Sequence, residues 1–151
     1  MIETPFRQPA GTPIQPSRAG GARGVARVGA RLAAGLKDLE GFERVWLLYW
    51  LHEAPPGQLR VRPFLDRMER GIFATRAPAR PCPIGMSAVR LLRIEGNRLE
   101  FEGAEMIDGT PLLDIKPYVP EFDSHPESRA GWFDGSRSRR KRADHRFERE
   151  A

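Results

Sequence analysis

The sequence predicts a mostly β fold with one short helix, and three features carry this prediction. Residues 44–51 (RVWLLYWL) form a continuous apolar and aromatic run, as expected for a buried strand. Residues 87–94 and 98–102 predict two strands joined by a glycine-containing turn. Only residues 30–39 place leucines near helical spacing, so we expect helices to contribute little.

The N-terminal part is predicted to be a long loop that leads into this helix. Residues 1–29 are rich in proline, glycine and arginine, and only residues 25–28 predict a short strand. The helix candidate at residues 30–39 has three leucines near helical spacing, although Gly35 weakens it.

The predicted strand at residues 44–51 is apolar on both faces. In so small a chain, a strand covered on both sides indicates either a closed barrel or a subunit interface. The second strand of the hairpin alternates cleanly, with Leu99 and Phe101 on one face, and the Gly-Asn pair before it suits the positive φ of the turn. A last strand is predicted at residues 111–115 and ends before two prolines.

Length and composition limit the class of protein. The 151 residues have the length of one domain. The longest apolar run, residues 45–51, is far shorter than the roughly 18 residues of a membrane span, and residues 1–15 lack the layout of a secretory signal. The lone Cys82 excludes an internal disulfide framework and fits a reducing compartment, so we expect a cytoplasmic protein.

The net charge of +5 is unevenly distributed. Residues 1–31 hold five arginines against one acid, and residues 134–151 hold seven Lys and Arg against four acids. We predict one folded domain over residues 1–133 and a basic, disordered tail over residues 134–151. Basic ends suit an RNA partner through phosphate contacts, but a merely solubilising tail explains the charge equally well.

Several kinds of site are not predicted. No glycine-rich loop follows a strand and opens a helix, so dinucleotide, Walker and Rossmann methyltransferase patterns are missing. His52, His125 and His145 are too scattered to form a metal site with one cysteine. Nothing in the sequence places a base beside Cys82, so an inert thiol is the simpler interpretation.

Residues 73–85 (FATRAPARPCPIG) are the segment most indicative of a functional site. Three prolines interleave with Arg76 and Arg80. Because proline fixes φ, such a loop positions its side chains at little entropic cost. The two guanidinium groups suit a carboxylate or a phosphate, although taken alone the segment is more simply a surface loop with solvated arginines.

Two other polar groupings have both a structural and a functional interpretation. Residues 108–111 (DGTP) carry tight-turn chemistry. His52 and Glu53 stand where the apolar strand meets a loop, which is a common place for a site and also simply where strands reach water. Gln15 would be unremarkable alone.

Taken in order, these segments resemble the TsaA-like family, whose characterised members include the TrmO tRNA methyltransferases. The resemblance runs from residues 4–6 (TPF) to residues 108–120 (DGTPLLDIKPYVP). Between them lie matches at residues 13–15 (PIQ), 36–42 (LKDLEGF), 61–63 (VRP) and 73–87, and in the strand that ends at His52. The combination of ATRxPxRPxPIG with DGTPxxDIKPY is highly specific.

The resemblance implies a small single-sheet β-barrel, unlike the Rossmann methyltransferases, that acts as a homodimer with S-adenosylmethionine near the subunit interface. It implies methyl transfer to the exocyclic nitrogen of threonylcarbamoyladenosine beside the tRNA anticodon, without a metal and without a membrane. The positions that match the family's cofactor contacts are Pro13, Ile14, Gln15, His52, Glu53, Arg76, Asp108, Gly109, Thr110 and Pro111.

Physical roles can be assigned within that set. We expect Arg76 to bind the methionyl carboxylate, and Asp108 or Glu53 to bind ribose hydroxyls or the amino group. The turn amides of Gly109 and Thr110 suit the adenine edge.

The substrate side requires a proton acceptor and an anion contact. We expect His52 or Asp108 to take the proton of the methylated nitrogen. Arg80 is the candidate for the threonyl carboxylate or a phosphate, so Arg80→Ala should raise KM for tRNA and leave cofactor affinity unchanged.

The sequence departs from the family pattern in three places. Cys82 stands where the family has asparagine, only three residues precede the TPF motif, and the basic residues 137–149 stand where some bacterial members carry a small extra domain. Two alternatives therefore remain. One is a cofactor- or RNA-binding module without turnover, and the other is a methyltransferase for another small substrate.

Overall fold

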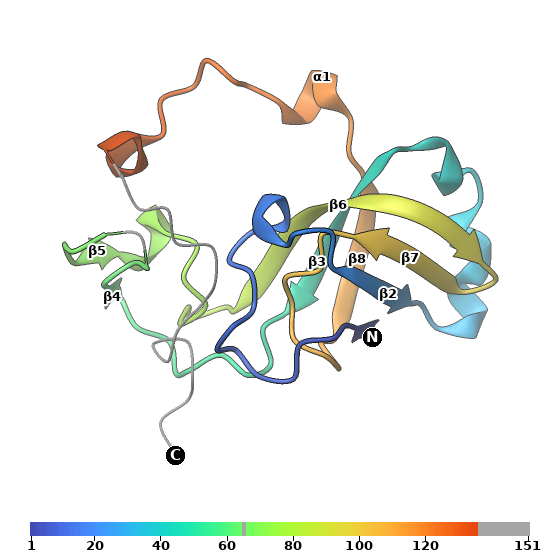
Figure 1. Ribbon diagram of the computed structural model, residues 1–151, viewed down its shortest axis with the longest axis horizontal. Helices are drawn as coiled ribbons and strands as arrows, with labels where there is room; N and C mark the ends of the chain where they lie inside the picture. Colours follow the sequence, from blue (N-terminus) through green and yellow to red (C-terminus); the bar gives the residue numbers. More distant parts are fainter. Residues whose placement is uncertain (65, 136–151) are drawn as a thin grey trace.

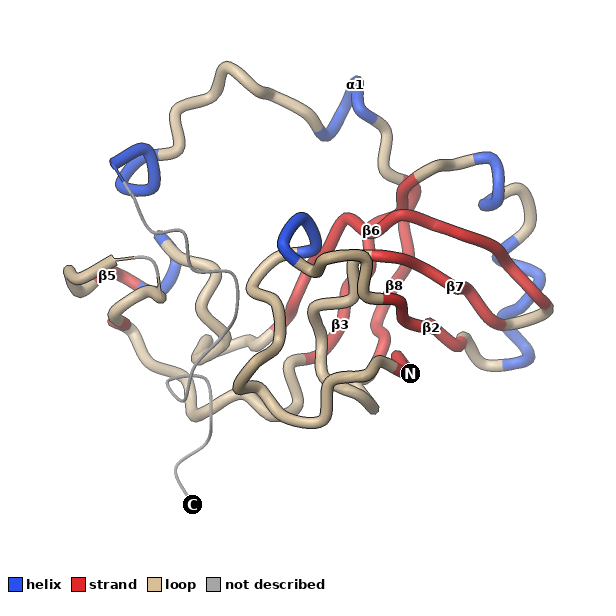
Figure 2. The backbone as a smooth tube through the Cα atoms, in the orientation of Figure 1, coloured by secondary structure: helices blue, strands red, loops and turns tan. Residues whose placement is uncertain are grey.

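The structure, a computed structural model, describes residues 1–64 and 66–135, and its centre is one curled antiparallel sheet (Figures 1 and 2). The sheet has six strands in the order β1-β2-β7-β6-β3-β8. They are β1 (Ile2–Glu3), β2 (Arg23–Arg27), β3 (Arg44–Trp50), β6 (Ile84–Glu95), β7 (Arg98–Glu102) and β8 (Leu112–Pro117). Two short strands, β4 (Arg60–Val61) and β5 (Arg70–Gly71), pair outside it. The mostly β prediction is confirmed.

The two edges of this sheet meet near the N-terminus. The Ile2 amide donates to the Thr110 carbonyl at 2.8 Å, and the Gly109 amide donates to the Ile2 carbonyl at 2.9 Å. A single bridge thus joins β1 to the residues that lead into β8 at the opposite edge. The predicted single-sheet barrel is confirmed as a small barrel-like sheet. Because β1 has only two residues, one bridge replaces a full ladder at the closure.

The core lies inside the curl of the sheet. Val45 and Leu47 of β3 and Val89 of β6 are fully buried, and Leu99 and Phe101 of β7 are 1% exposed. The alternation predicted for residues 98–102 is therefore confirmed, since the intervening residues of β7 are only half-buried.

The outer face of β3 is less covered than predicted. Trp46 and Leu48 are half-buried, and Trp50 is 39% exposed. The prediction of a strand buried on both faces is wrong for the single chain. Only part of that face finds a packing partner, such as Trp46 against the Tyr118 ring with 5.5 Å between centroids.

The β6–β7 hairpin turns at Gly96, whose φ of +59° falls in the left-handed region. The Asn97 side chain fixes this turn by donating to the Val28 carbonyl at 2.7 Å. Strand β6 begins at Ile84, three residues earlier than predicted. Its Gly85 lies against the Tyr49 ring, where an added Cβ would be 2.2 Å from the nearest ring atom, so only glycine fits this approach.

The predicted helix at residues 30–39 is instead two 3-10 segments, η2 (Ala30–Leu36) and η3 (Leu39–Gly41). Asp38 separates them because its φ of +66° cannot continue a helix. Leu36 is buried and Leu39 packs against the core, whereas Leu32 is 59% exposed.

Four further short helical segments lie outside the sheet. They are η1 (Pro16–Arg18), η4 (Ile72–Ala74), α1 (Pro120–Asp123) and η5 (Gly131–Gly135). After β8 the chain passes through α1 and arches across to η5, near β5 (Figure 1). No helix among the described residues is long and apolar enough to cross a membrane. The predicted basic tail lies, from residue 136 onward, outside the described residues.

Candidate functional site

A cavity of about 960 Å³ opens beside the ends of β3 and β6. Its walls come from the loop before η1, the residues after β3, the segment after η4, the segment between β7 and β8, and η5. The lining residues include Pro13, Ile14, Gln15, Tyr49, Leu51, His52, Glu53, Phe64, Phe73, Arg76, Arg80, Ile84, Met86, Glu105, Met106, Thr110, Trp132 and Phe133. This volume lies in the range of small-molecule sites, roughly 300–1,000 Å³.

The proline-rich segment after η4 is organised by Arg80. Its Nη1 donates to the carbonyls of Ile72, Thr75 and Ala77 at 3.3, 2.8 and 3.4 Å. The Arg80 guanidinium also lies over the Phe73 ring, 6.0 Å from its centroid. Arg80 therefore holds the loop together, which the sequence did not predict. This role uses part of the guanidinium group that we expected to bind substrate.

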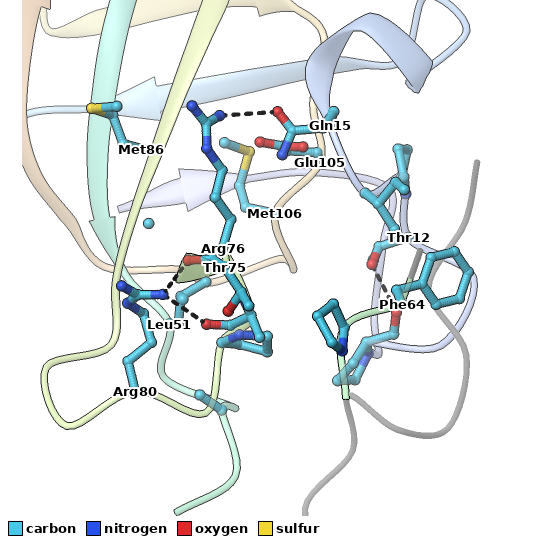
Figure 3. Close-up of a pocket in the computed structure, with 18 of the residues that line it drawn as sticks. Thr12, Gln15, Leu51, Phe64, Thr75, Arg76, Arg80, Met86, Glu105 and Met106 are labelled. Carbon is cyan, nitrogen blue, oxygen red and sulfur yellow. Dashed lines mark hydrogen bonds between the residues drawn. The ribbon is translucent and has the colours of Figure 1, made fainter. Parts of the chain in front are cut away.

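Arg76 extends into the cavity from this organised loop (Figure 3). Its Nη1 donates to Gln15 Oε1 at 3.4 Å. The structure thus brings together two predicted cofactor-binding residues that are 61 positions apart in the sequence. Since the bond is long and Gln15 is neutral, the Arg76 charge stays available for an anionic ligand.

Three hydrogen-bonded side chains connect the cavity wall with the interior, since Tyr49 and Glu105 line the cavity and Ser87 lies buried between them. The Tyr49 hydroxyl and Ser87 Oγ are 2.8 Å apart, and Ser87 donates to Glu105 Oε1. Because Ser87 has one proton and gives it to the carboxylate, the Tyr49 hydroxyl donates to Ser87. Burial raises the pKa of the Tyr49 hydroxyl well above its ordinary value, so it stays protonated.

Burial also raises the pKa of the Glu105 carboxyl, to about 7. The hydrogen bond from Ser87 and the positive charge of Arg76 act in the opposite direction, but desolvation is the larger effect. A carboxyl group with this pKa changes its charge near neutral pH. Neither Glu105 nor its two partners was among the residues predicted for the site.

His52 and Glu53 lie in the cavity wall just after β3. The His52 Nε2 and Glu53 Oε1 atoms are 3.7 Å apart, with side chains 28% and 52% exposed. Pro13 and Ile14 also line the cavity, next to Gln15.

The DGTP turn is only partly in this cavity. Thr110 lines it, whereas Asp108, Gly109 and Pro111 do not. The Asp108 carboxylate accepts the Thr4 amide at 3.0 Å and forms an ion pair with Arg7. Because this turn makes the bridge that closes the sheet, it directs Asp108 toward the N-terminal segment instead of the cavity.

Aromatic side chains surround the cavity mouth. Phe73 is 79% exposed and Phe133 is 46% exposed. Trp132 is held in place because its Nε1 donates to the Ala74 carbonyl at 2.7 Å and its ring lies 5.7 Å from the Arg70 guanidinium carbon. Residues 132 and 133 were not predicted, since they follow the segment of family resemblance.

Among residues 1–64 and 66–135, no three His, Cys, Asp or Glu side chains are grouped closely enough to hold a metal ion. Cys82 is exposed and unpaired by any disulfide.

Comparison with known proteins gives consistent relatives. The family model of the tRNA-methyltransferase O N-terminal domain matches residues 1–124. A probable S-adenosyl-L-methionine-binding protein of Pyrococcus abyssi is 47% identical over 134 residues, covering 89% of this chain and 73% of that protein. A human tRNA (adenine(37)-N6)-methyltransferase is 37% identical over 130 residues, covering 82% of this chain and 30% of the human protein.

The crystal structure of TrmO from Pseudomonas aeruginosa superimposes with a TM-score of 0.72 at 38% identity. That similarity covers 87% of this chain, which spans 58% of the TrmO chain.

Proposed function

The chain belongs to the tRNA-methyltransferase O family, and from this membership we propose that it methylates the exocyclic nitrogen of an adenosine in tRNA, with S-adenosylmethionine as the donor. The observation that carries the proposal is the family match over residues 1–124, which contains the whole cavity wall except Ala130, Trp132 and Phe133. Within this activity, the substrate is threonylcarbamoyladenosine next to the anticodon.

The donor set of the cavity fits this cofactor. Arg76 provides a guanidinium group for the methionyl carboxylate. Gln15 and Glu53 provide acceptors for the amino and ribose hydroxyl groups, while Leu51 and Met106 provide apolar wall. The volume of about 960 Å³ lies near the upper end of the range for small-molecule sites, roughly 300–1,000 Å³, which suits a cofactor together with part of the target base.

The reaction makes limited demands on the protein. S-adenosylmethionine supplies a methyl group on a positively charged sulfur, which is already a strong methyl donor. The residues of the chain have to hold the target nitrogen in line at contact distance and to remove its proton. Of the two predicted proton acceptors, His52 lies in the cavity wall, whereas Asp108 pairs with Arg7 outside it.

The cavity mouth suits an RNA base. The exposed Phe73 ring offers a stacking surface, and stacking of a base on an aromatic side chain is worth about 1–3 kcal/mol. Arg76 and Arg80 lie in the same segment and provide positive charge for the surrounding backbone.

The outer face of the sheet supports a homodimer. Trp50, Ile84 and Met86 are 39%, 44% and 47% exposed on neighbouring strands. Apolar side chains grouped on an uncovered face are typical of an interface. Since Ile84 and Met86 also line the cavity, a second copy on this face would stand beside the cofactor.

The test is methylation of defined tRNA, analysed by nucleoside mass spectrometry. With S-adenosylmethionine present, we expect methylated product from tRNA that carries threonylcarbamoyladenosine, and none from the same tRNA with plain adenosine. Product from plain adenosine would show a broader substrate. No product from either tRNA, despite measurable cofactor binding, would favour the binding module or a small-molecule substrate.

A matched pair of variants tests the base-stacking surface. Phe73→Ala should raise KM for tRNA about 5- to 150-fold, because one stacking contact of about 1–3 kcal/mol is lost. Phe122→Ala is the control, since Phe122 is also an exposed phenylalanine, 71% exposed, but lies in α1 and outside the cavity wall. Equal effects of the two substitutions would contradict a role for Phe73 in binding the base.

A further inference from the structure

We infer that Glu105 is the group that accepts the proton lost by the target nitrogen during methyl transfer. This inference rests on the proposed function, and it assigns the base to a residue outside both predicted candidates, His52 and Asp108. Three observations carry it: the position of the carboxylate, its surroundings, and the way it is held.

Glu105 lies in the cavity together with the proposed cofactor contacts. Figure 3 shows Glu105 together with Gln15, Arg76 and Met106 around the same cavity. All four residues line the same cavity. A base in this cavity shares the space that the cofactor and the target nitrogen would occupy, where the proton has to be removed.

The carboxylate is fixed by two neighbouring strands. Ser87 of β6 donates to Oε1, and Tyr49 of β3 donates in turn to Ser87. Ser87 holds the carboxylate through Oε1, Tyr49 acts on the carboxyl group as well, and Glu105 lines the cavity. The Gly85 backbone lies against the Tyr49 ring and so helps hold this chain of hydrogen bonds in position.

Among the described residues, few charged or titratable groups act on Glu105. Tyr49 faces it from β3, Ser87 from β6, and Arg76 from the segment after η4. In the described part of the chain, Glu105 forms no ion pair within 4 Å, whereas Asp108 has Arg7. Burial consequently dominates and raises the pKa of the Glu105 carboxyl to about 7, the range in which a base works best at neutral pH.

Methyl transfer to the target nitrogen needs no proton acceptor other than Glu105. The lone pair of the target nitrogen forms the new bond to the methyl carbon, and the carbon–sulfur bond breaks with its electron pair moving to sulfur. The sulfonium thereby becomes a neutral thioether. The proton on the nitrogen passes to the Glu105 carboxylate, and the neutral carboxyl group later returns it to water.

The experiment compares the full chain with Glu105→Gln and Glu105→Asp, at saturating cofactor and tRNA in single turnovers. We expect Glu105→Gln to lower the rate constant about 100-fold or more, as loss of a general base does, with Glu105→Asp partly active. Cofactor affinity by calorimetry should change less than about threefold, because a neutral amide keeps the shape of the site. Glu102→Gln, on the outward side of β7 and paired with Arg90, should behave like the unchanged protein.

The pH profile adds a signature that a structural role would not produce. The rate of the unchanged protein should rise with an apparent pKa near 7, and this limb should vanish in Glu105→Gln. In cofactor-free protein labelled at its glutamate carboxyl carbons, one NMR signal absent from Glu105→Gln should titrate in the same range.

The outcomes separate the two proposals. If the unchanged protein methylates tRNA but Glu105→Gln keeps its rate, or loses rate only in proportion to cofactor affinity, the inference about Glu105 is wrong and the proposed function stands. A Glu105 signal that titrates at an ordinary glutamate pKa also overturns the inference. If the unchanged protein methylates no tRNA, the proposed function is wrong, and the inference about Glu105, which rests on it, is wrong as well.

Discussion

Arg76 and Arg80 are four positions apart in one loop, but their side chains make different contacts. Arg76 has one long bond to Gln15, whereas Arg80 donates to three carbonyl groups of its own loop. The prediction that Arg76 binds the cofactor and Arg80 binds the substrate therefore leaves out a second role of Arg80. Arg80 also positions the segment from which Arg76 projects.

This difference predicts two distinct phenotypes. Arg76→Ala should weaken S-adenosylmethionine binding about 10- to 100-fold, the loss of a hydrogen bond to a charged group, while the thermal midpoint stays within a degree or two. Arg80→Ala should lower the thermal midpoint and also weaken cofactor binding, because three loop carbonyls lose their donor. Calorimetric titration and thermal unfolding of both variants check this. Unchanged cofactor affinity in Arg80→Ala would instead restore a purely substrate-side role.

The raised pKa of Glu105 predicts a dependence of stability on pH. With an unfolded pKa near 4.5 and a folded pKa of about 7, the native state binds more protons than the unfolded state between these values. This contribution to stability is complete below pH 4.5 and is lost as the pH rises through 7.

Glu105→Gln should remove this slope. Relative to the unchanged protein, the variant should gain up to about 3 kcal/mol in free energy of unfolding between pH 4.5 and pH 8, at about 1.4 kcal/mol for each pKa unit. Urea unfolding at both pH values measures the difference, with Glu102→Gln as reference. Parallel stability curves for the two proteins would show that the carboxyl is not desolvated.

At the scale of elements, the sequence predicts strands better than helices. Apolar alternation is local, so residues 98–102 were assigned to the correct faces. The start of β6 was missed because Pro83 and Gly85 are poor strand residues, and only the Tyr49 ring explains the glycine. The prediction of a helix at residues 30–39 was wrong because leucine spacing does not reveal the left-handed backbone at Asp38.

In the site, too, the residues that belong to a local sequence pattern could be predicted, and those brought together only by the fold could not. Arg76 and Gln15 belong to a motif, so the resemblance points to them. Tyr49, Ser87 and Glu105 are single residues 38 and 18 positions apart. Only the pairing of β3 with β6 and the curl of the sheet bring them together, and no local pattern in the sequence marks such a contact.

The uncovered face of β3 and β6 predicts the oligomeric state. Trp50→Glu places a charge in the apolar face, and it should convert a dimer into a monomer because burying an unpaired carboxylate is costly. Leu59→Glu is the control, since Leu59 is 74% exposed and lies outside this sheet. Sedimentation velocity distinguishes the species. A dimer that survives Trp50→Glu would place the interface elsewhere.

At the scale of the whole molecule, the positive charge is concentrated at the two ends of the chain, while the middle is slightly acidic. The stretch at residues 136–151 holds seven Lys and Arg and three acids. Because RNA binding through phosphates releases counterions, each contact adds to the dependence of affinity on salt. Among the described residues, the cavity proposed for the cofactor is lined by residues before this stretch, so the two binding events should respond differently to its removal.

Removal of residues 136–151 should therefore weaken tRNA binding and flatten its salt dependence, while leaving the S-adenosylmethionine dissociation constant unchanged. Each lost phosphate contact should reduce the slope of log affinity against log salt by about 0.7 to 0.9. Titrations at several salt concentrations measure the slope. A neutral Gly/Ser segment of equal length separates charge from length, and a shuffled tail with the same charges separates charge from sequence. An unchanged slope after truncation would mean that the basic residues only keep the protein soluble, and that RNA is held by the arginine and aromatic side chains around the cavity alone.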